Sequence, residues 1–316
     1  MRIARATTLI VLLLTALVAQ LAYAELPPLI PREMLFGNPE RTAPQLSPDG
    51  TRIAWIAPDK KNVLQVWVRT VGKDDGRMVT NDRKRGIRQY FWARDDKTLI
   101  YLQDTDGDEN FHVHGVDLTN NNDRDYTAIQ GVRAGVVAVE RDFPSEVLVQ
   151  MNARDRKIFD VYRLNIETGA LSLDTQNPGD VAGWLADKRL NVLGARVTTP
   201  DGGTEIRIRD NPTAPWRTWM KVGPDEILGL IAFSEDAKSA YLISSLGSDT
   251  ARVVQKEIAG NGAEKVIASS QAVDAGNVVI HPVTKTVQAV AFDPGRRSWT
   301  VIDPTIKADF DGITKL

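Results

Sequence analysis

The stretch Pro44-Gln45-Leu46-Ser47-Pro48-Asp49-Gly50 decides the fold, because its pattern returns along the whole chain. Its Ser, Pro, Asp and Gly residues are those that reverse a chain between antiparallel strands. Two apolar segments follow it, residues 52–57 and 64–70, and both contain the Val, Ile and Trp that pleated, half-buried strands favour. The stretch therefore predicts a hairpin turn within an antiparallel sheet.

Five further copies of this unit follow at nearly constant spacing. The six equivalent turn positions are Asp49, Asp95, Phe143, Asp187, Asp236 and Val283, separated by 46, 48, 44, 49 and 47 residues. A period of about 45 residues that holds four strands is the size of a β-propeller blade. We predict an all-β chain, a β-propeller with six recognisable four-stranded blades of a seven-bladed ring. The alternative, a large β-sandwich of unrelated hairpins, does not explain the regular spacing.

The first 24 residues read as a signal peptide. Arg2 and Arg5 precede an apolar run over residues 9–18, and Ala22-Tyr23-Ala24 matches the small-x-small cleavage pattern. The run is shorter than the ~20 residues of a membrane-spanning helix. We expect cleavage after Ala24 and a periplasmic or secreted protein with no membrane attachment after cleavage. The alternative is an uncleaved N-terminal anchor.

Composition excludes several classes of function. The chain has 39 basic and 41 acidic side chains, and removal of Arg2 and Arg5 with the leader changes the net charge from −2 to −4. This mild acidic excess gives no electrostatic reason to expect a nucleic-acid partner. The chain contains no cysteine, which excludes disulfides, thiolate metal sites and a cysteine nucleophile.

A resemblance to a known family rests on one region, which runs from Arg85-Gly86-Ile87-Arg88-Gln89-Tyr90-Phe91-Trp92 through Gly107-Asp108-Glu109-Asn110 to His112 and Val116-Asp117-Leu118. The region resembles the N-terminal propeller of exported bacterial serine peptidases of the prolyl oligopeptidase family, close to their acylaminoacyl-peptidase and dipeptidyl-peptidase-like branch. The resemblance covers residues 30 to 316. It implies a seven-bladed propeller that precedes an α/β-hydrolase domain with a nucleophilic Ser on a Gly-x-Ser-x-Gly elbow.

The sequence departs from that pattern in one decisive respect. No Gly-x-Ser-x-Gly occurs, and Gly247-Ser248 has the wrong neighbours for an elbow. We therefore expect no catalytic residue in this chain and no activity of the chain alone. The predicted order is a signal peptide (1–24), a lead-in (25–43), propeller blades (44–304) and the start of a truncated remainder, helical or loop-like (305–316). Short peptides are the expected substrates, through the missing C-terminal hydrolase domain.

The two histidines at 112 and 114 are the main metal candidates. They lie two residues apart on a predicted strand, so both face one side of the sheet. Together with the nearby Asp104, Asp106 and Asp108 they have the chemistry to hold zinc, but the favoured explanation is that they are polar residues on a solvent-facing strand. We predict no metal and no cofactor. His281 precedes Pro282 at a blade turn and is expected to be structural.

The loop from Asp104 to Asn110 is rich in carboxylates. It fails the EF-hand pattern, because Gly falls at position four and position twelve is Gly115. The expected role is a turn whose side chains cap backbone amides. By resemblance to related exopeptidases, which use propeller carboxylates to bind a peptide's N-terminal amine, Asp108 and Glu109 are the candidate substrate-binding residues.

Two other groups have simpler explanations. The basic run Arg83-Lys84-Arg85 with Arg88 is expected to be a solvated loop, with docking to the missing domain as the alternative. Four tryptophans in or beside predicted strands are expected to pack between blades rather than to stack on a ligand: Trp55, Trp67, Trp92 and Trp184.

Three functions remain in competition. The first is the non-catalytic, substrate-gating lid of a serine peptidase that hydrolyses short peptides. The second is a stand-alone periplasmic propeller that binds a protein partner, as TolB-like modules do. The third, an enzyme housed in the propeller itself, predicts turnover or metal retention that depends on His112 or Asp108.

Overall fold

The computed structural model describes residues 28–260 and 262–315. The predicted signal peptide and the first residues of the lead-in lie outside this part. The chain forms two compact units, Met1–Pro39 and Glu40–Leu316. The described part of the first contains one short helix, α2 (Arg32–Phe36), with no buried residue. Across the described ranges, no helix combines the length and apolar character that a membrane span requires.

The second unit is a series of antiparallel sheets, each formed by strands that follow one another along the chain. The first three sheets are β1 (Thr42–Leu46), β2 (Arg52–Pro58), β3 (Leu64–Thr70) and β4 (Arg77–Met78); β5 (Tyr90–Trp92), β6 (Thr98–Gln103), β7 (His112–Asp117) and β8 (Asn122–Asp125); and β9 (Ala134–Val139), β10 (Glu146–Asp155), β11 (Ile158–Asn165) and β12 (Leu171–Thr175).

The next three sheets repeat this pattern. They are β13 (Val181–Ala186), β14 (Val192–Thr198), β15 (Thr204–Ile208) and β16 (Arg217–Val222); β17 (Leu228–Phe233), β18 (Ser239–Ser244), β19 (Arg252–Glu257) and β20 (Lys265–Ala268); and β21 (Ala275–Ile280), β22 (Val287–Phe292) and β23 (Ser298–Val301).

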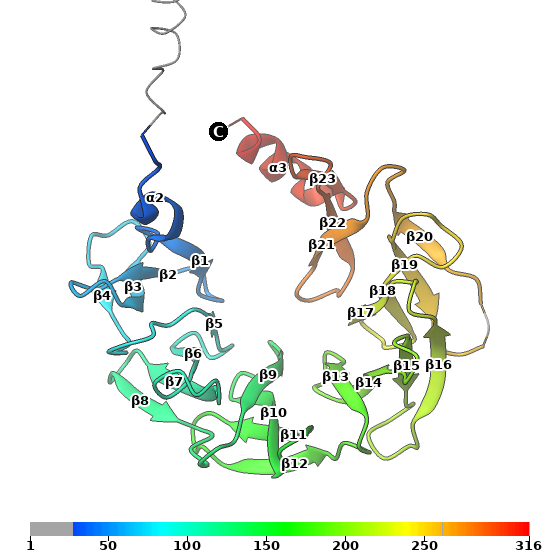
Figure 1. Cartoon of the computed structure of the whole chain (residues 1–316), viewed down its shortest axis with the longest axis horizontal. Coiled ribbons are helices and arrows are strands. Elements are labelled where there is room, and N and C mark those ends of the chain that lie inside the picture. The colour runs from blue at the N-terminus through cyan, green and yellow to red at the C-terminus, as the bar shows by residue number, and fades with distance from the viewer. Residues whose placement is uncertain (1–27, 261, 316) are drawn as a thin grey trace, which may run out of the picture. The chain divides into compact units, whose positions relative to one another are not determined.

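The six sheets follow one another around a common centre in chain order (Figure 1). The first strand of each sheet contributes residues to one central cavity, from Gln45 on β1 to Ile280 on β21. This is the radial arrangement of a β-propeller, so the predicted fold is confirmed and each sheet is a blade.

The sixth blade differs from the predicted four-stranded unit, because it has three strands in the described residues. After β23 the chain enters a 3₁₀ turn, η1 (Pro304–Ile306), and the helix α3 (Lys307–Ile313). Asp303 accepts a hydrogen bond from the Thr305 N–H (2.9 Å), and Pro304 has no N–H to donate to a strand ladder. The helix lies against β23 through the edge-on contact of Phe310 with Trp299, whose ring centroids are 5.5 Å apart.

The predicted blade turns hold their shape through a side chain that accepts backbone N–H groups. The Asp49 carboxylate accepts the Thr51 N–H at 3.0 Å, and Asp187 accepts the Asn191 N–H at 2.8 Å. In the sixth blade His281 takes this role, because its Nδ1 accepts the Val283 and Thr284 N–H groups at 3.1 and 3.0 Å. The expected structural role of His281 is thus confirmed.

The turn of the first blade leads to a testable prediction about the pKa of the Asp49 carboxyl group. Hydrogen bonds from Ser47 and Thr51 lower the pKa of Asp49 to about 2. A lowered pKa in the folded state contributes stability at neutral pH that is lost as the pH falls from 3.8 toward 2. We expect Ser47→Ala to raise the pKa of Asp49 toward its ordinary value, as followed by NMR titration of the carboxyl carbon. An unchanged pKa would show that the Ser47 hydroxyl does not stabilise the carboxylate.

The apolar core lies between neighbouring blades. Separate clusters of buried side chains join the first and second, second and third, third and fourth, fourth and fifth, and fifth and sixth blades. Within the described ranges, no cluster joins the sixth blade to the first. Trp92 and Trp184 belong to these clusters, as predicted. Trp55 and Trp67 are only half-buried.

Core packing between blades sets the stability of the propeller. Leu242 on β18 is fully buried against the fourth blade. Leu242→Ala is expected to lower the free energy of unfolding by about 2–5 kcal/mol, because it removes apolar contacts and leaves a cavity. Urea denaturation measures this change. The matched control is Leu173→Ala on β12, where the side chain is 53% exposed and little change is expected.

Candidate functional site

The central cavity has a volume of about 610 Å³ and is lined by first strands and by the turns that follow them. Its walls combine apolar and polar surface, and the segment 136–139 of β9 and the segment 231–233 of β17 contribute apolar side chains. Charged side chains reach it from the turns, among them Arg94, Lys188 and Lys285. A cavity that combines apolar surface with charged and polar side chains is suited to bind a small ligand or a peptide segment.

An ion pair connects two blades that are far apart in the sequence. The Lys285 Nζ in the sixth blade donates to both carboxylate oxygens of Glu140 in the third blade, at 2.8 and 2.6 Å. Both side chains are only 15% exposed, and both line the central cavity. This contact holds the third and sixth blades together across the cavity. The sequence carries no signal for it, because the two residues are 145 positions apart.

A double-mutant cycle measures this link. Glu140→Gln and Lys285→Met are each expected to destabilise the protein, and the double variant less than the sum of the two. We expect a coupling of about 1 kcal/mol, the upper end for pairs that water still reaches. Urea denaturation of the four proteins gives the coupling. Additive effects would show that the pair contributes nothing to stability.

The predicted substrate-binding residues lie elsewhere. Asp108 and Glu109 are exposed on the loop between β6 and β7, and neither lines the central cavity or the cavity that lies next to this loop. The Asp108 carboxylate accepts the backbone N–H groups of Asn110 at 3.0 Å and Thr105 at 3.2 Å. The Asn110 hydrogen bonds lower the pKa of Asp108. The loop is therefore a capped turn, as expected, and the binding role of Asp108 and Glu109 stays a prediction.

A second cavity, of about 430 Å³, lies next to this loop and gathers positive charge. Arg85 and Arg88 of the basic run line it together with Arg133, which precedes β9 and was not singled out from the sequence. The Arg133 guanidinium lies 5.8 Å from the centre of the Phe111 ring. Lys84, in contrast, points to Asp106 at 2.8 Å and is exposed. The basic run is thus divided between a surface ion pair and a cavity wall.

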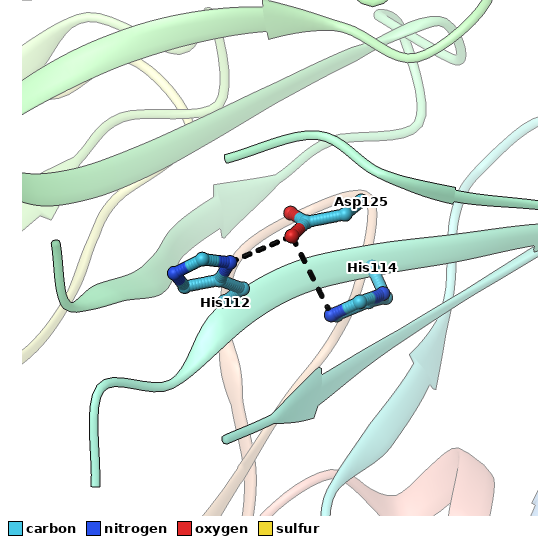
Figure 2. A group of neighbouring side chains, drawn as sticks. All are labelled: His112, His114 and Asp125. Atoms are coloured by element: carbon cyan, nitrogen blue, oxygen red, sulfur yellow. Dashed lines mark hydrogen bonds and ion pairs between the residues drawn. The ribbon is translucent and has the colours of Figure 1, made fainter. Parts of the chain in front are cut away.

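The histidine pair has a different carboxylate partner from those proposed on sequence grounds. Figure 2 shows His112 and His114 on one side of β7, as predicted, with Asp125 of β8 between them. His112 Nδ1 and Asp125 Oδ2 are 2.6 Å apart, and His114 Nε2 lies 3.9 Å from the same oxygen. The three side chains are 17–26% exposed, which corrects the expectation of a solvent-facing pair.

The position of Asp125 follows from strand register. It pairs directly with His114 across the β7–β8 ladder, so its side chain lies on the same face of the blade. His114 also stacks on Tyr101, with ring centroids 5.1 Å apart. Burial lowers the pKa of His114, against the opposing effect of Asp125 and Asp123. No sequence signal identified Asp125. It lies eleven residues after His114, and whether these two residues pair depends on the turn between β7 and β8, which fixes the register of the two strands.

Comparison with known proteins shows which proteins the chain is related to. It is 35% identical over 286 residues to dipeptidyl aminopeptidase BIII of Pseudoxanthomonas mexicana, a match that covers 90% of this chain and 41% of that protein. The chain is homologous to dipeptidyl peptidases. A second relative, dipeptidyl peptidase family member 6 of Caenorhabditis elegans, is 27% identical over 277 residues, with 83% of this chain and 37% of that protein covered. The chain thus spans about 40% of the length of these dipeptidyl peptidases.

Structural comparison supports the fold. The β-propeller domain of the trilobed protease from Pyrococcus furiosus superposes with a TM-score of 0.50 at 15% identity, covering 84% of this chain and 85% of that domain. No family model matches the chain. The resemblance to peptidase propellers inferred from residues 85–118 is confirmed by the homology with dipeptidyl peptidases.

Proposed function

We propose that this chain is the substrate-gating propeller of an exported serine dipeptidyl peptidase that hydrolyses short peptides. In this proposal the chain carries no nucleophile, and a hydrolase domain of the same enzyme supplies the catalytic Ser, Asp and His. The observation that carries it is the homology to a dipeptidyl aminopeptidase over 90% of the chain.

The central cavity supports a steric role. First strands of all six blades surround it, and the Glu140–Lys285 pair crosses it, so the passage is narrow. Such an opening admits an extended peptide and excludes a folded protein. In this proposal it also limits the access of bulk water to the catalytic site of the hydrolase domain. The proposed role therefore needs only the cavity and its ion pair, and no reactive group in this chain.

The first test uses the chain alone. The purified chain is expected to show no turnover of a chromogenic dipeptide substrate, because it contains no Gly-x-Ser-x-Gly elbow. Turnover that co-purifies with the chain and is lost in His112→Ala or Asp108→Ala would favour an enzyme housed in the propeller and overturn the proposal.

The second test uses the gene and the whole enzyme. The reading frame beyond codon 316, or an adjacent frame, is expected to encode a Gly-x-Ser-x-Gly elbow followed by Asp and His. In that enzyme, Lys285→Met should raise kcat/KM for a long peptide relative to that for a chromogenic dipeptide substrate by on the order of tenfold, about 1.4 kcal/mol. A frame without the elbow would favour the stand-alone binding module. An unchanged ratio would exclude the ion pair as a gate.

A further inference from the structure

We propose that His112, His114 and Asp125 form a binding site for one divalent transition-metal ion of the zinc class. The proposed ligand atoms are His112 Nδ1, His114 Nε2 and Asp125 Oδ2. Two imidazoles and one carboxylate are a donor set that zinc accepts in proteins. The site lies on the two outer strands of the second blade and is separate from the central cavity.

The distances between the ligand atoms come close to those of a metal centre. One potential ligand atom from each of the three residues lies within 4.8 Å of those from the other two. Bonds of 2.0–2.2 Å in a tetrahedral arrangement place neighbouring ligand atoms about 3.4 Å apart. The distances of Asp125 Oδ2 from the two histidines, 2.6 and 3.9 Å, fall on either side of this value. Figure 2 shows the Asp125 carboxylate between the two imidazole rings, and the proposed ion lies among these three groups.

Groups around the site hold the ligands in position. The Asp125 Oδ1 atom accepts the Thr127 N–H at 2.9 Å, which leaves Oδ2 for the metal. The buried Thr127 hydroxyl accepts the Val113 N–H at 2.9 Å and so ties this segment to β7. The Tyr101 ring that stacks on His114 is itself held by hydrogen bonds from its hydroxyl to Asp123, at 2.8 and 2.7 Å. Such outer contacts orient metal ligands and raise affinity.

Binding requires a change of tautomer at His112. Where Nδ1 donates its proton to Asp125 in the metal-free state, this proton moves to Nε2 so that the Nδ1 lone pair can bind the ion. The nearby Asp123 carboxylate adds negative charge that favours a dication. With three protein ligands and partial exposure, the fourth position is open to water or to an external ligand. The ion would join β7 to the outermost strand β8.

The decisive experiment titrates zinc and cobalt into the protein. We use an untagged, EDTA-treated chain, and the absence of cysteine removes competing thiolates. Isothermal titration calorimetry is expected to show one Zn²⁺ per chain, and Co²⁺ should develop the visible d–d bands of a four- or five-coordinate ion. In NMR spectra, Zn²⁺ should shift the imidazole signals of two of the three histidines.

Variants locate the site. His114→Ala and Asp125→Asn are each expected to weaken Zn²⁺ binding at least tenfold, because loss of even an outer contact costs about 10–100-fold. His281→Ala, which removes the remaining histidine, is the matched control and should bind as the parent protein does. Circular dichroism and urea denaturation verify that each variant is folded.

Three results would overturn the proposal. The first is the absence of saturable Zn²⁺ binding by the parent protein. The second is unchanged binding in folded His114→Ala and Asp125→Asn variants. The third, which depends on no variant, is a Zn²⁺ complex in which the His112 and His114 imidazole signals do not shift.

Discussion

The fold depends on apolar packing between the faces of neighbouring blades. A four-stranded sheet has two faces, and alone it buries neither. Here each blade shares a cluster of buried side chains with at least one neighbouring blade, and Leu99, Leu148 and Leu242 are examples of its members. These contacts orient the sheets around one centre, so the first strands surround a cavity and the outer strands lie at the rim. Both sites described above are consequences of that arrangement.

The blades could be predicted from the sequence because their turns and strands are encoded by residues that are close together in the chain. Turns at Asp49, Asp187 and His281 are encoded by residues within four positions of one another, because a side chain there accepts the amides of its own turn. Apolar segments after the turns mark the strands. The spacing of these signals therefore identifies blades from sequence alone. The prediction of a fourth strand in the sixth blade was wrong, because Asp303 caps a 3₁₀ turn that begins at Pro304 directly after β23.

The candidate sites were harder to predict, because their residues meet only in the folded chain. Glu140 and Lys285 face each other because the third and sixth blades lie across one cavity. His112 and His114 were recognisable as a pair, but Asp125 joins them through the register of β7 and β8. Sequence reasoning instead favoured the acidic residues nearest in the chain, such as Asp108, whose carboxylate is occupied by its own loop.

The series of apolar clusters that join neighbouring blades determines where the propeller opens locally. In the described residues an inner blade shares a core with two neighbours, whereas the first and sixth blades share a core with one. In such one-dimensional arrays, stability is a sum of each unit and its nearest-neighbour contacts. Local opening therefore requires less free energy at the first and sixth blades than at the third or fourth. Amide protons should exchange with solvent soonest in those two blades, and the middle blades should form the slow-exchanging nucleus of the propeller.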